Sequence, residues 1–203
     1  MIKLYIFFCI LFFTCFPLKS QTIKMDNGLA ISSFSSKELK MLNTAIKSYS
    51  FMFGIDYINS NIIGLSSQIG YLCKGGKETM GYPVISASDF VEKVDYIHFN
   101  TTVRLKYMKF FYCIYIGVGP KIDILLDDNY LKSSIYNDYK LSTISAGLKY
   151  EVGFEQYLNN RISVGLNFSY IQNIGKVGGT VYNKLLNDTY LLSFSLGYRL
   201  KNH

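Results

Sequence analysis

Residues 144–154, ISAGLKYEVGF, alternate between apolar side chains and small or charged ones. The even positions from Ile144 to Phe154 are all apolar, whereas the odd positions from Ser145 to Gly153 are small or charged. Successive side chains of a β-strand point to opposite faces, so this pattern predicts a strand with one apolar and one polar face. A soluble core and a lipid bilayer would both favour such a strand.

The same alternation recurs along the chain and predicts eight strands, at about 28–34, 48–58, 61–72, 95–107, 110–125, 141–157, 161–172 and 189–200. Short connections follow the second, fourth and sixth strands: NSN at 59–61, MK at 108–109 and NN at 159–160. Long connections follow the first, third, fifth and seventh strands, at about 35–47, 73–94, 126–140 and 173–188. Alternate connections of antiparallel strands lie at opposite ends, and outer-membrane barrels have short turns at one end and long loops at the other. The sequence therefore predicts an all-β fold, an eight-stranded antiparallel up-and-down transmembrane β-barrel.

The first long connection has a second feature. Ser35 and Glu38 have the spacing of a helical capping box, and Leu39, Leu42 and Ile46 follow at helical spacing. The pattern predicts a helical turn or two here, with an irregular amphipathic loop as the alternative.

The apolar face of the strands carries aromatic residues at both ends and aliphatic residues between them. Tyr has an apolar ring and a polar hydroxyl, so it suits the boundary between membrane and water. Two aromatic girdles are predicted: Tyr57, Tyr107, Tyr112, Phe154 and Tyr198 near the short turns, and Tyr49, Tyr71, Tyr96, Tyr170 and Tyr190 near the long loops. Girdles on either side of an aliphatic band are typical of a transmembrane barrel, so we expect this face to contact lipid.

The polar face must then line the lumen. With eight strands the interior is just wide enough for side chains, and buried charges require partners. We therefore expect a side-chain-filled lumen with a structural polar network: Asp56, His98, Arg104, Lys106, Lys121, Asp123, Lys149, Glu151, Glu155 and Arg199. An aqueous channel would need about 16 strands.

The N-terminal segment MIKLYIFFCILFFTCFPLKSQ has the layout of a secretory signal peptide, with basic Lys3, an apolar run and small polar residues near Ser20. We assign residues 1–20 to the signal peptide and residues 21–203 to the outer-membrane barrel domain. An uncleaved anchor is the alternative, although the apolar run is shorter than the ~20 residues of a spanning helix.

Charge and candidate chemistry narrow the function further. The net charge of the chain is +7, and removal of the signal peptide with its two lysines lowers it by two. The remaining basic residues are spread along the chain, whereas a nucleic-acid-binding protein would cluster them. Cys73 and Cys113, on separate strands, are expected to be free and buried. No zinc-type spacing of Cys and His appears, so we expect no metal and no cofactor.

His98 is the one candidate for catalysis. Asp95 and Ser88 are close to it in sequence, but a Ser–His–acid site requires hydrogen-bond geometry that spacing alone does not give. We interpret His98 as part of the lumen network and predict no catalytic residues.

Four segments of the chain have a recognisable wording: YIHFNTTVRLKYMK, YIGVGPKIDILL, STISAGLKYEVGFE and FSLGYRL, of which GVGP and LGYR are the more specific. Through these segments, and over roughly residues 21–201, the chain resembles the PorT-like outer-membrane β-barrel family of Bacteroidota. The resemblance implies an eight-stranded barrel in the outer membrane, and one branch of the family serves protein secretion.

These features predict a non-enzymatic outer-membrane protein that acts structurally or through its long loops or periplasmic rim. The expected surroundings are membrane lipid and lipopolysaccharide, with envelope or secretion proteins as partners, and the barrel is expected to be a monomer. Two alternatives stay open: a lipid-modifying enzyme of the outer membrane, and a soluble barrel that binds an apolar ligand inside.

Overall fold

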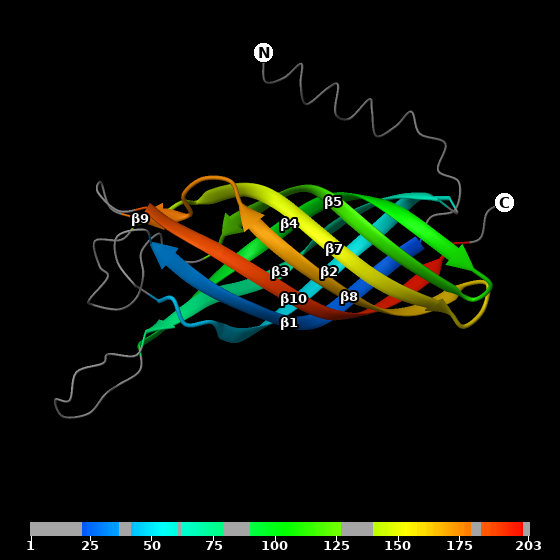
Figure 1. Cartoon of the computed structure of the whole chain (residues 1–203), viewed down its shortest axis with the longest axis horizontal. Helices are drawn as coiled ribbons and strands as arrows, with labels where there is room; N and C mark the ends of the chain where they lie inside the picture. The colour runs from blue at the N-terminus through cyan, green and yellow to red at the C-terminus, as the bar shows by residue number, and fades with distance from the viewer. Residues whose placement is uncertain are drawn as a thin grey trace, which may run out of the picture.

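The computed structural model describes residues 22–36, 42–60, 62–78, 90–126, 140–179 and 184–200. Within these ranges the chain forms eight long strands and two short ones, wrapped into a closed barrel (Figure 1). The strands are β1 (Thr22–Ser36), β2 (Ile46–Asn59), β3 (Ile63–Glu78), β4 (Phe90–Lys109), β5 (Tyr112–Leu125), β6 (Lys140–Leu141), β7 (Ile144–Tyr157), β8 (Ile162–Asn173), β9 (Gly178–Gly179) and β10 (Lys184–Arg199). In this part of the chain, no helix is long and apolar enough to cross a membrane. The predicted signal peptide lies outside the described residues.

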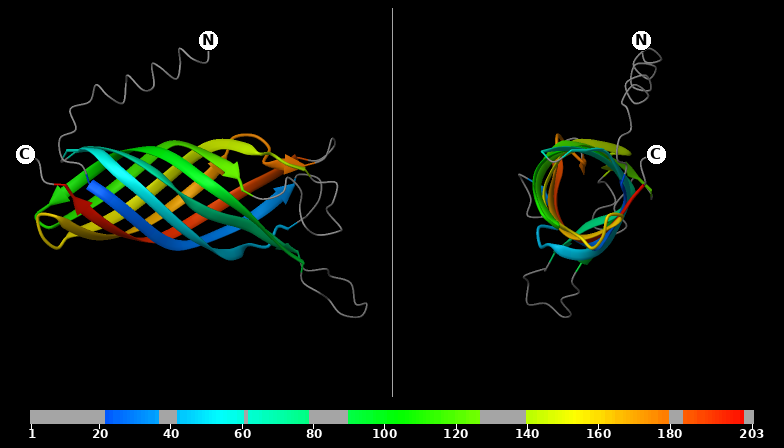
Figure 2. Two further views of the ribbon diagram at one scale, coloured as in Figure 1. Left: turned by 180° about the vertical axis from the view of Figure 1, so that it is seen from behind. Right: turned by 90° about the vertical axis from the view of Figure 1, so that its right-hand side faces the viewer.

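Closure depends on the first and last strands. β1 pairs antiparallel with β2 on one side and with β10 on the other, in a register that runs from Thr22↔Arg199 to Ser36↔Leu185. Figure 2 shows the result as a closed ring seen along the barrel. A closed ladder leaves no strand edge without hydrogen bonds, which is the condition for a β-sheet in lipid. The predicted eight-stranded antiparallel barrel is confirmed.

The strands extend further than the alternation predicted. β3 continues to Glu78 and β4 begins at Phe90, so the long connection expected at 73–94 is shorter than predicted. Glycines in the predicted connection lie inside β3. A Cβ on Gly76 would lie 2.1 Å from the carbonyl oxygen of Leu42, so a bare backbone is needed where the two segments meet. Sequence alone favoured a loop because Gly-Gly is a turn signal.

The helix predicted in the first long connection is not supported. Ser35, its expected N-cap, lies in β1, and Ile46 begins β2. Glu38 and Leu39 lie outside the described residues, and Leu42 is buried with a positive φ of 47°.

Three tight turns join strands at the end of the barrel where β1 begins and β10 ends. Ser60 and Asn159 accept backbone hydrogen bonds in two of them, from the amides of Ile63 and Ile162. The third turn was predicted at residues 108–109 but consists of Phe110 and Phe111, because the ladder between β4 and β5 continues to Lys109↔Tyr112. Phe110 takes a positive φ of 51°, an unfavourable conformation for a bulky residue that no sequence pattern here suggested.

Candidate functional site

The outer wall of the barrel is apolar. Its aliphatic and aromatic side chains alternate with buried residues along every long strand, and those between the two ends include Leu29, Val103, Ile116, Leu166 and Leu192, each more than half exposed. Water does not favour so continuous an exposed apolar surface, whereas the hydrocarbon core of a bilayer does. The second alternative, a soluble barrel with this face inside, is therefore wrong.

Nine of the ten predicted girdle residues lie on the outer face. Tyr49, Tyr107, Phe154, Tyr190 and Tyr198 are exposed, and Tyr57, Tyr71, Tyr112 and Tyr170 are partly exposed. The prediction for Tyr96 is wrong, because Tyr96 is fully buried in the lumen. Tyr96 and His98 are two residues apart in one strand and must share a face.

Aromatic stacking links neighbouring strands on the outer wall. The rings of Tyr112 and Phe154 lie 6.2 Å apart at the short-turn end. At the other end Tyr170 stacks between Tyr150 and Tyr190, with ring centroids 6.2 and 5.0 Å away. Such pairs add stability beyond their buried area. Tyr150 was not among the predicted girdle residues.

The lumen contains a first ionic cluster on the short-turn side. Arg104 donates hydrogen bonds to Asp56, at 3.1 Å, and to Glu151. Lys24 forms ion pairs with Asp56, at 2.7 Å, and with Glu155. All five side chains are at most 5% exposed, so each buried charge meets an opposite charge, as stability in a low-dielectric interior requires.

The same cluster extends along the lumen through Lys149. Its ammonium group lies 2.9 Å from Glu151 and donates to Gln68 at 2.7 Å. Gln68 in turn donates to Asp26 at 2.6 Å. Tyr115 lies on the other side of the cluster, with its ring 4.6 Å from the guanidinium of Arg104. This network joins side chains of β1, β2, β3, β4 and β7, and so connects strands that lie far apart in sequence.

A second ionic cluster lies nearer the long loops and is centred on Asp123. Lys74 and the Nδ1 atom of His98 each lie 2.6 Å from its carboxylate oxygens, and Lys121 also pairs with it. The ammonium group of Lys74 also lies over the ring of Tyr96, 5.3 Å from its centroid, so Tyr96 contacts this cluster inside the lumen.

The structure thus brings together most of the predicted network. Arg199 is an exception: its guanidinium lies over the ring of Tyr157, 5.2 Å from the centroid. Lys106 is buried beside Gly64. Sequence analysis missed Lys24, because alternation in the first strand was weak, and Lys74, because it was assigned to a loop. Period-two spacing from Gln68 through Gly70 to Lys74 could have identified the latter.

The lumen closes with apolar residues at the long-loop end. One buried cluster comprises Phe34, Leu42, Val94, Tyr96, Leu125, Leu141, Val177 and Leu185, and a second comprises Ala30, Met52, Leu72, Ile171 and Leu191. The alternation predicted a polar inner face throughout, so these clusters are a difference from the sequence analysis. In the first cluster, Leu42 and Val177 come from connections between strands and pack with strand residues, whereas all members of the second cluster lie in the long strands.

The geometry of His98 does not form the Ser–His–acid site that was considered. His98 is fully buried, and its acid partner is Asp123 rather than Asp95. Asp95 accepts a hydrogen bond from Tyr71 at 2.6 Å on the other face of the strand, and Ser88 lies outside the described residues. Among the described residues, no cluster of three metal-ligating side chains occurs, and Cys73 and Cys113 are free and buried, as predicted.

Comparison with known proteins identifies the fold. No family model and no curated protein matches the chain. Among solved structures, it is similar to the outer membrane protein OprG from Pseudomonas aeruginosa, with 15% identity over 91% of this chain and 97% of OprG and a TM-score of 0.60. Neisserial surface protein A has 14% identity over 90% of this chain and 99% of its own, with a TM-score of 0.59. The outer membrane protein AlkL has 18% identity over 91% of this chain and 92% of its own, with a TM-score of 0.54.

The fold and the outer wall together define the class. The chain is an eight-stranded β-barrel of the bacterial outer membrane, as predicted. The three tight turns lie at one end of the barrel and the long connections at the other, and in outer-membrane barrels the end with short turns usually faces the periplasm.

Proposed function

We propose that the protein is a non-enzymatic, non-conducting outer-membrane barrel of the PorT-like kind, which acts through its extracellular loops or periplasmic rim. The observation that carries this proposal is the filled lumen. Two ionic clusters and an apolar closure occupy successive levels of the interior, and side chains such as Arg104, Lys121 and Phe34 are almost completely buried. Packing of this kind supports a barrel that does not conduct solutes.

Conductance measurements test the filled lumen directly. We expect the purified barrel in planar lipid bilayers to give no single-channel steps, with a 16-stranded porin in the same bilayers as the positive control. Folding is verified beforehand by heat-modifiable migration in gels. Reproducible steps from a correctly folded barrel would contradict the proposal.

The periplasmic rim is the better-supported place for protein contacts. Phe110 is 84% exposed and Phe111 is 72% exposed at the β4–β5 turn, and Phe110 also holds an unfavourable backbone conformation. Exposed aromatic residues and local backbone strain are both characteristic of binding sites. Ile62 and Leu158 add exposed apolar side chains on the neighbouring turns.

Site-specific photo-cross-linking tests the rim. A photoreactive residue in place of Phe111 should cross-link an envelope protein in intact cells, whereas the same residue in place of Leu192 on the outer wall should cross-link lipid alone. Protein adducts from position 192 but not from position 111 would contradict the rim as the contact. The proposal further expects a monomer surrounded by lipid and lipopolysaccharide, with no nucleic-acid partner.

The lipid-modifying enzyme remains the other candidate, and His98 decides between the two. The proposal gives His98 a structural role because its ring is buried against Asp123. We expect the lipid A of cells carrying His98→Asn to have an unchanged mass spectrum. A change in acylation would favour the enzyme.

A further inference from the structure

A trough crosses the outer wall between β2 and β5. Its upper bank is one cross-strand row of large residues, since Phe53 pairs with Ile69, Ile69 with Phe99 and Phe99 with Ile122. The next row begins with Ile55 on β2 and contains smaller residues on the strands after it, because Ile55 pairs with Ser67, Ser67 pairs with Thr101, and Pro120 lines the trough on β5.

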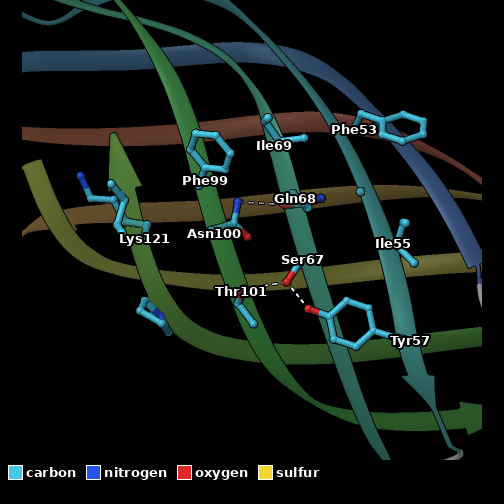
Figure 3. A pocket seen from close by; sticks show the side chains of 13 residues that line it. Phe53, Ile55, Tyr57, Ser67, Gln68, Ile69, Phe99, Asn100, Thr101 and Lys121 are labelled. Carbon is cyan, nitrogen blue, oxygen red and sulfur yellow. Dashed lines mark hydrogen bonds between the residues drawn. The ribbon is translucent and has the colours of Figure 1, made fainter. Parts of the chain in front are cut away.

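Beyond the small residues, the following row again has larger side chains, since Leu65 pairs with Val103 and Val103 with Val118. The groove over the small residues has a volume of about 510 Å³, within the usual range of ligand pockets, and Tyr57 lines it beside Ser67 and Thr101 (Figure 3).

The floor of the trough carries three hydroxyl groups that bond to one another. Ser67 Oγ lies 2.6 Å from Thr101 Oγ1, and Tyr57 Oη also bonds to Ser67 Oγ (Figure 3). Hydroxyls on a lipid-facing wall are unfavourable unless they are hydrogen-bonded, and here they satisfy one another. Their small size, rather than their polarity, therefore shapes the groove, and an apolar chain can lie over them.

The position of the trough determines what can reach it. Its banks belong to the outer apolar wall, with Phe53, Ile69 and Ile122 each more than 40% exposed. The groove therefore opens to the membrane and is continuous with the surface that already contacts lipid. A ligand that enters from the membrane must have an apolar part to match this lining, and an acyl chain has one.

Two lysines indicate which leaflet supplies this chain. Lys47 and Lys93 are exposed, and each precedes a bank residue, Phe53 or Phe99, by six positions on the same strand. Six residues rise about 20 Å along a strand, or about 15 Å along the membrane normal at a tilt of about 40°. This distance is half of the ~30 Å hydrocarbon thickness, so the lysines lie at the depth of lipid headgroups when the trough lies near the midplane.

The opposite leaflet fits less well. On β4 the exposed lysine at the short-turn end is Lys109, ten positions beyond Phe99. The same estimate puts it about 25 Å from the trough, beyond the reach of one lipid that spans half of the bilayer. Asp95 lies on the same face of β4 and accepts a hydrogen bond from Tyr71, so it sets one carboxylate against the two ammonium groups of Lys47 and Lys93.

From these observations we infer that the β2–β5 wall binds one phosphorylated acyl-glycolipid of the outer leaflet, the lipid A part of lipopolysaccharide. Lys47 and Lys93 contact the phosphate, and one acyl chain occupies the trough. This site is separate from the lumen and the rim on which the proposed function depends, so either can fail without the other.

Native mass spectrometry of the whole barrel released from detergent micelles tests the site. The probes are bisphosphorylated lipid A, its dephosphorylated form and phosphatidylglycerol. We expect one retained lipid A and about thirtyfold weaker retention of the dephosphorylated form, the ratio that two lysines at about 1 kcal/mol each near a membrane surface would give. Equal retention of the two forms, or tighter retention of phosphatidylglycerol, would overturn the assignment.

Paired variants locate the lipid. Ser67→Leu with Thr101→Leu fills the trough with residues that lipid tolerates, so folding should persist while lipid retention falls about tenfold. Lys47→Gln with Lys93→Gln should abolish the preference for phosphate, and the matched pair Lys140→Gln with Lys176→Gln, at exposed positions on other elements, should not. Unchanged binding by the folded trough variant would refute the site.

A fluorescence measurement tests the site without relying on the folding of the Ser67→Leu, Thr101→Leu variant. The chain contains no Trp, so Phe99→Trp introduces a single reporter at the trough, and Phe168→Trp introduces one on β8 at a similar exposure. Lipid A with brominated acyl chains should quench the Trp at position 99 at lower lipid concentration than the Trp at position 168. Equal quenching at both positions would show that the wall contacts lipid without a specific site.

Discussion

The carboxylate of Glu151 contacts several side chains in the lumen. The substitution Glu151→Gln therefore tests whether the ionic cluster stabilises the barrel. Arg104 and Thr102 donate to one carboxylate oxygen, and Lys149 lies 2.9 Å from the other. Gln has nearly the same shape but no charge, and its amide nitrogen cannot accept hydrogen bonds. The substitution therefore leaves a donor facing a donor and one uncompensated positive charge in the lumen.

The expected loss of stability depends on the partners that Arg104 and Lys149 keep in the variant. Breaking a buried ion pair costs about 3–5 kcal/mol. Arg104 keeps Asp56 at 3.1 Å and Lys149 keeps Gln68 at 2.7 Å, so we expect a loss near the lower limit, about 3 kcal/mol in the free energy of unfolding. Urea titration of the barrel in lipid vesicles, followed by heat-modifiable gel migration and circular dichroism, measures this loss.

Glu155→Gln is the matched control. Glu155 pairs with Lys24, and Lys24 keeps Asp56 at 2.7 Å, so the loss should be about 2 kcal/mol or less. Adding Lys149→Met to Glu151→Gln restores the charge balance and should recover part of the stability. A loss below about 1 kcal/mol for Glu151→Gln, or an equal loss for Glu155→Gln, would refute the reasoning, because a water-filled lumen would then be screening the charges.

Three further changes test other parts of the barrel. Leu192→Arg on the lipid-facing wall should reduce the free energy of folding into vesicles by about 2–4 kcal/mol, and a loss near zero in refolding titrations would mean that this position faces water. Tyr96→Phe removes a buried hydroxyl for which the described residues supply no hydrogen-bond partner, so urea unfolding should show unchanged or slightly higher stability; a clear loss would show that the hydroxyl has a partner. Phe110 has a positive φ, which Gly adopts without strain, so Phe110→Gly should raise the free energy of unfolding by about 1 kcal/mol. A decrease in the same titration would contradict this and would show that contacts of the ring outweigh the backbone strain.

Alternation was sufficient to predict the fold and most inward-facing residues. Asp56, Arg104, Lys149 and Glu151 were assigned correctly because the two-residue period fixes the face of each side chain once the apolar face is known. Tyr96 was assigned wrongly because the girdle pattern was given more weight than its two-residue spacing from His98.

Partners within the lumen could not be predicted. Lys24 and Glu155 are 131 residues apart in sequence, and their contact depends on barrel closure and on the register of every strand between them. The apolar clusters at the long-loop end escaped prediction for a related reason. Leu42 and Val177 lie in connections that pack over the lumen, and the period of a strand gives no information about such segments.

Pairing between β1 and β10 also determines the order in which this protein can assemble. The seam joins the first strand to the last through fifteen residue pairs, from Thr22↔Arg199 to Ser36↔Leu185. Because the final strand is synthesised last, the barrel cannot close, and Lys24 cannot be held between Asp56 and Glu155, until the whole chain has crossed the inner membrane. Until then β1 and β8 are open edges, for which both lipid insertion and aggregation are hazards. Closure of the β1–β10 seam is therefore the step that removes both open edges at once.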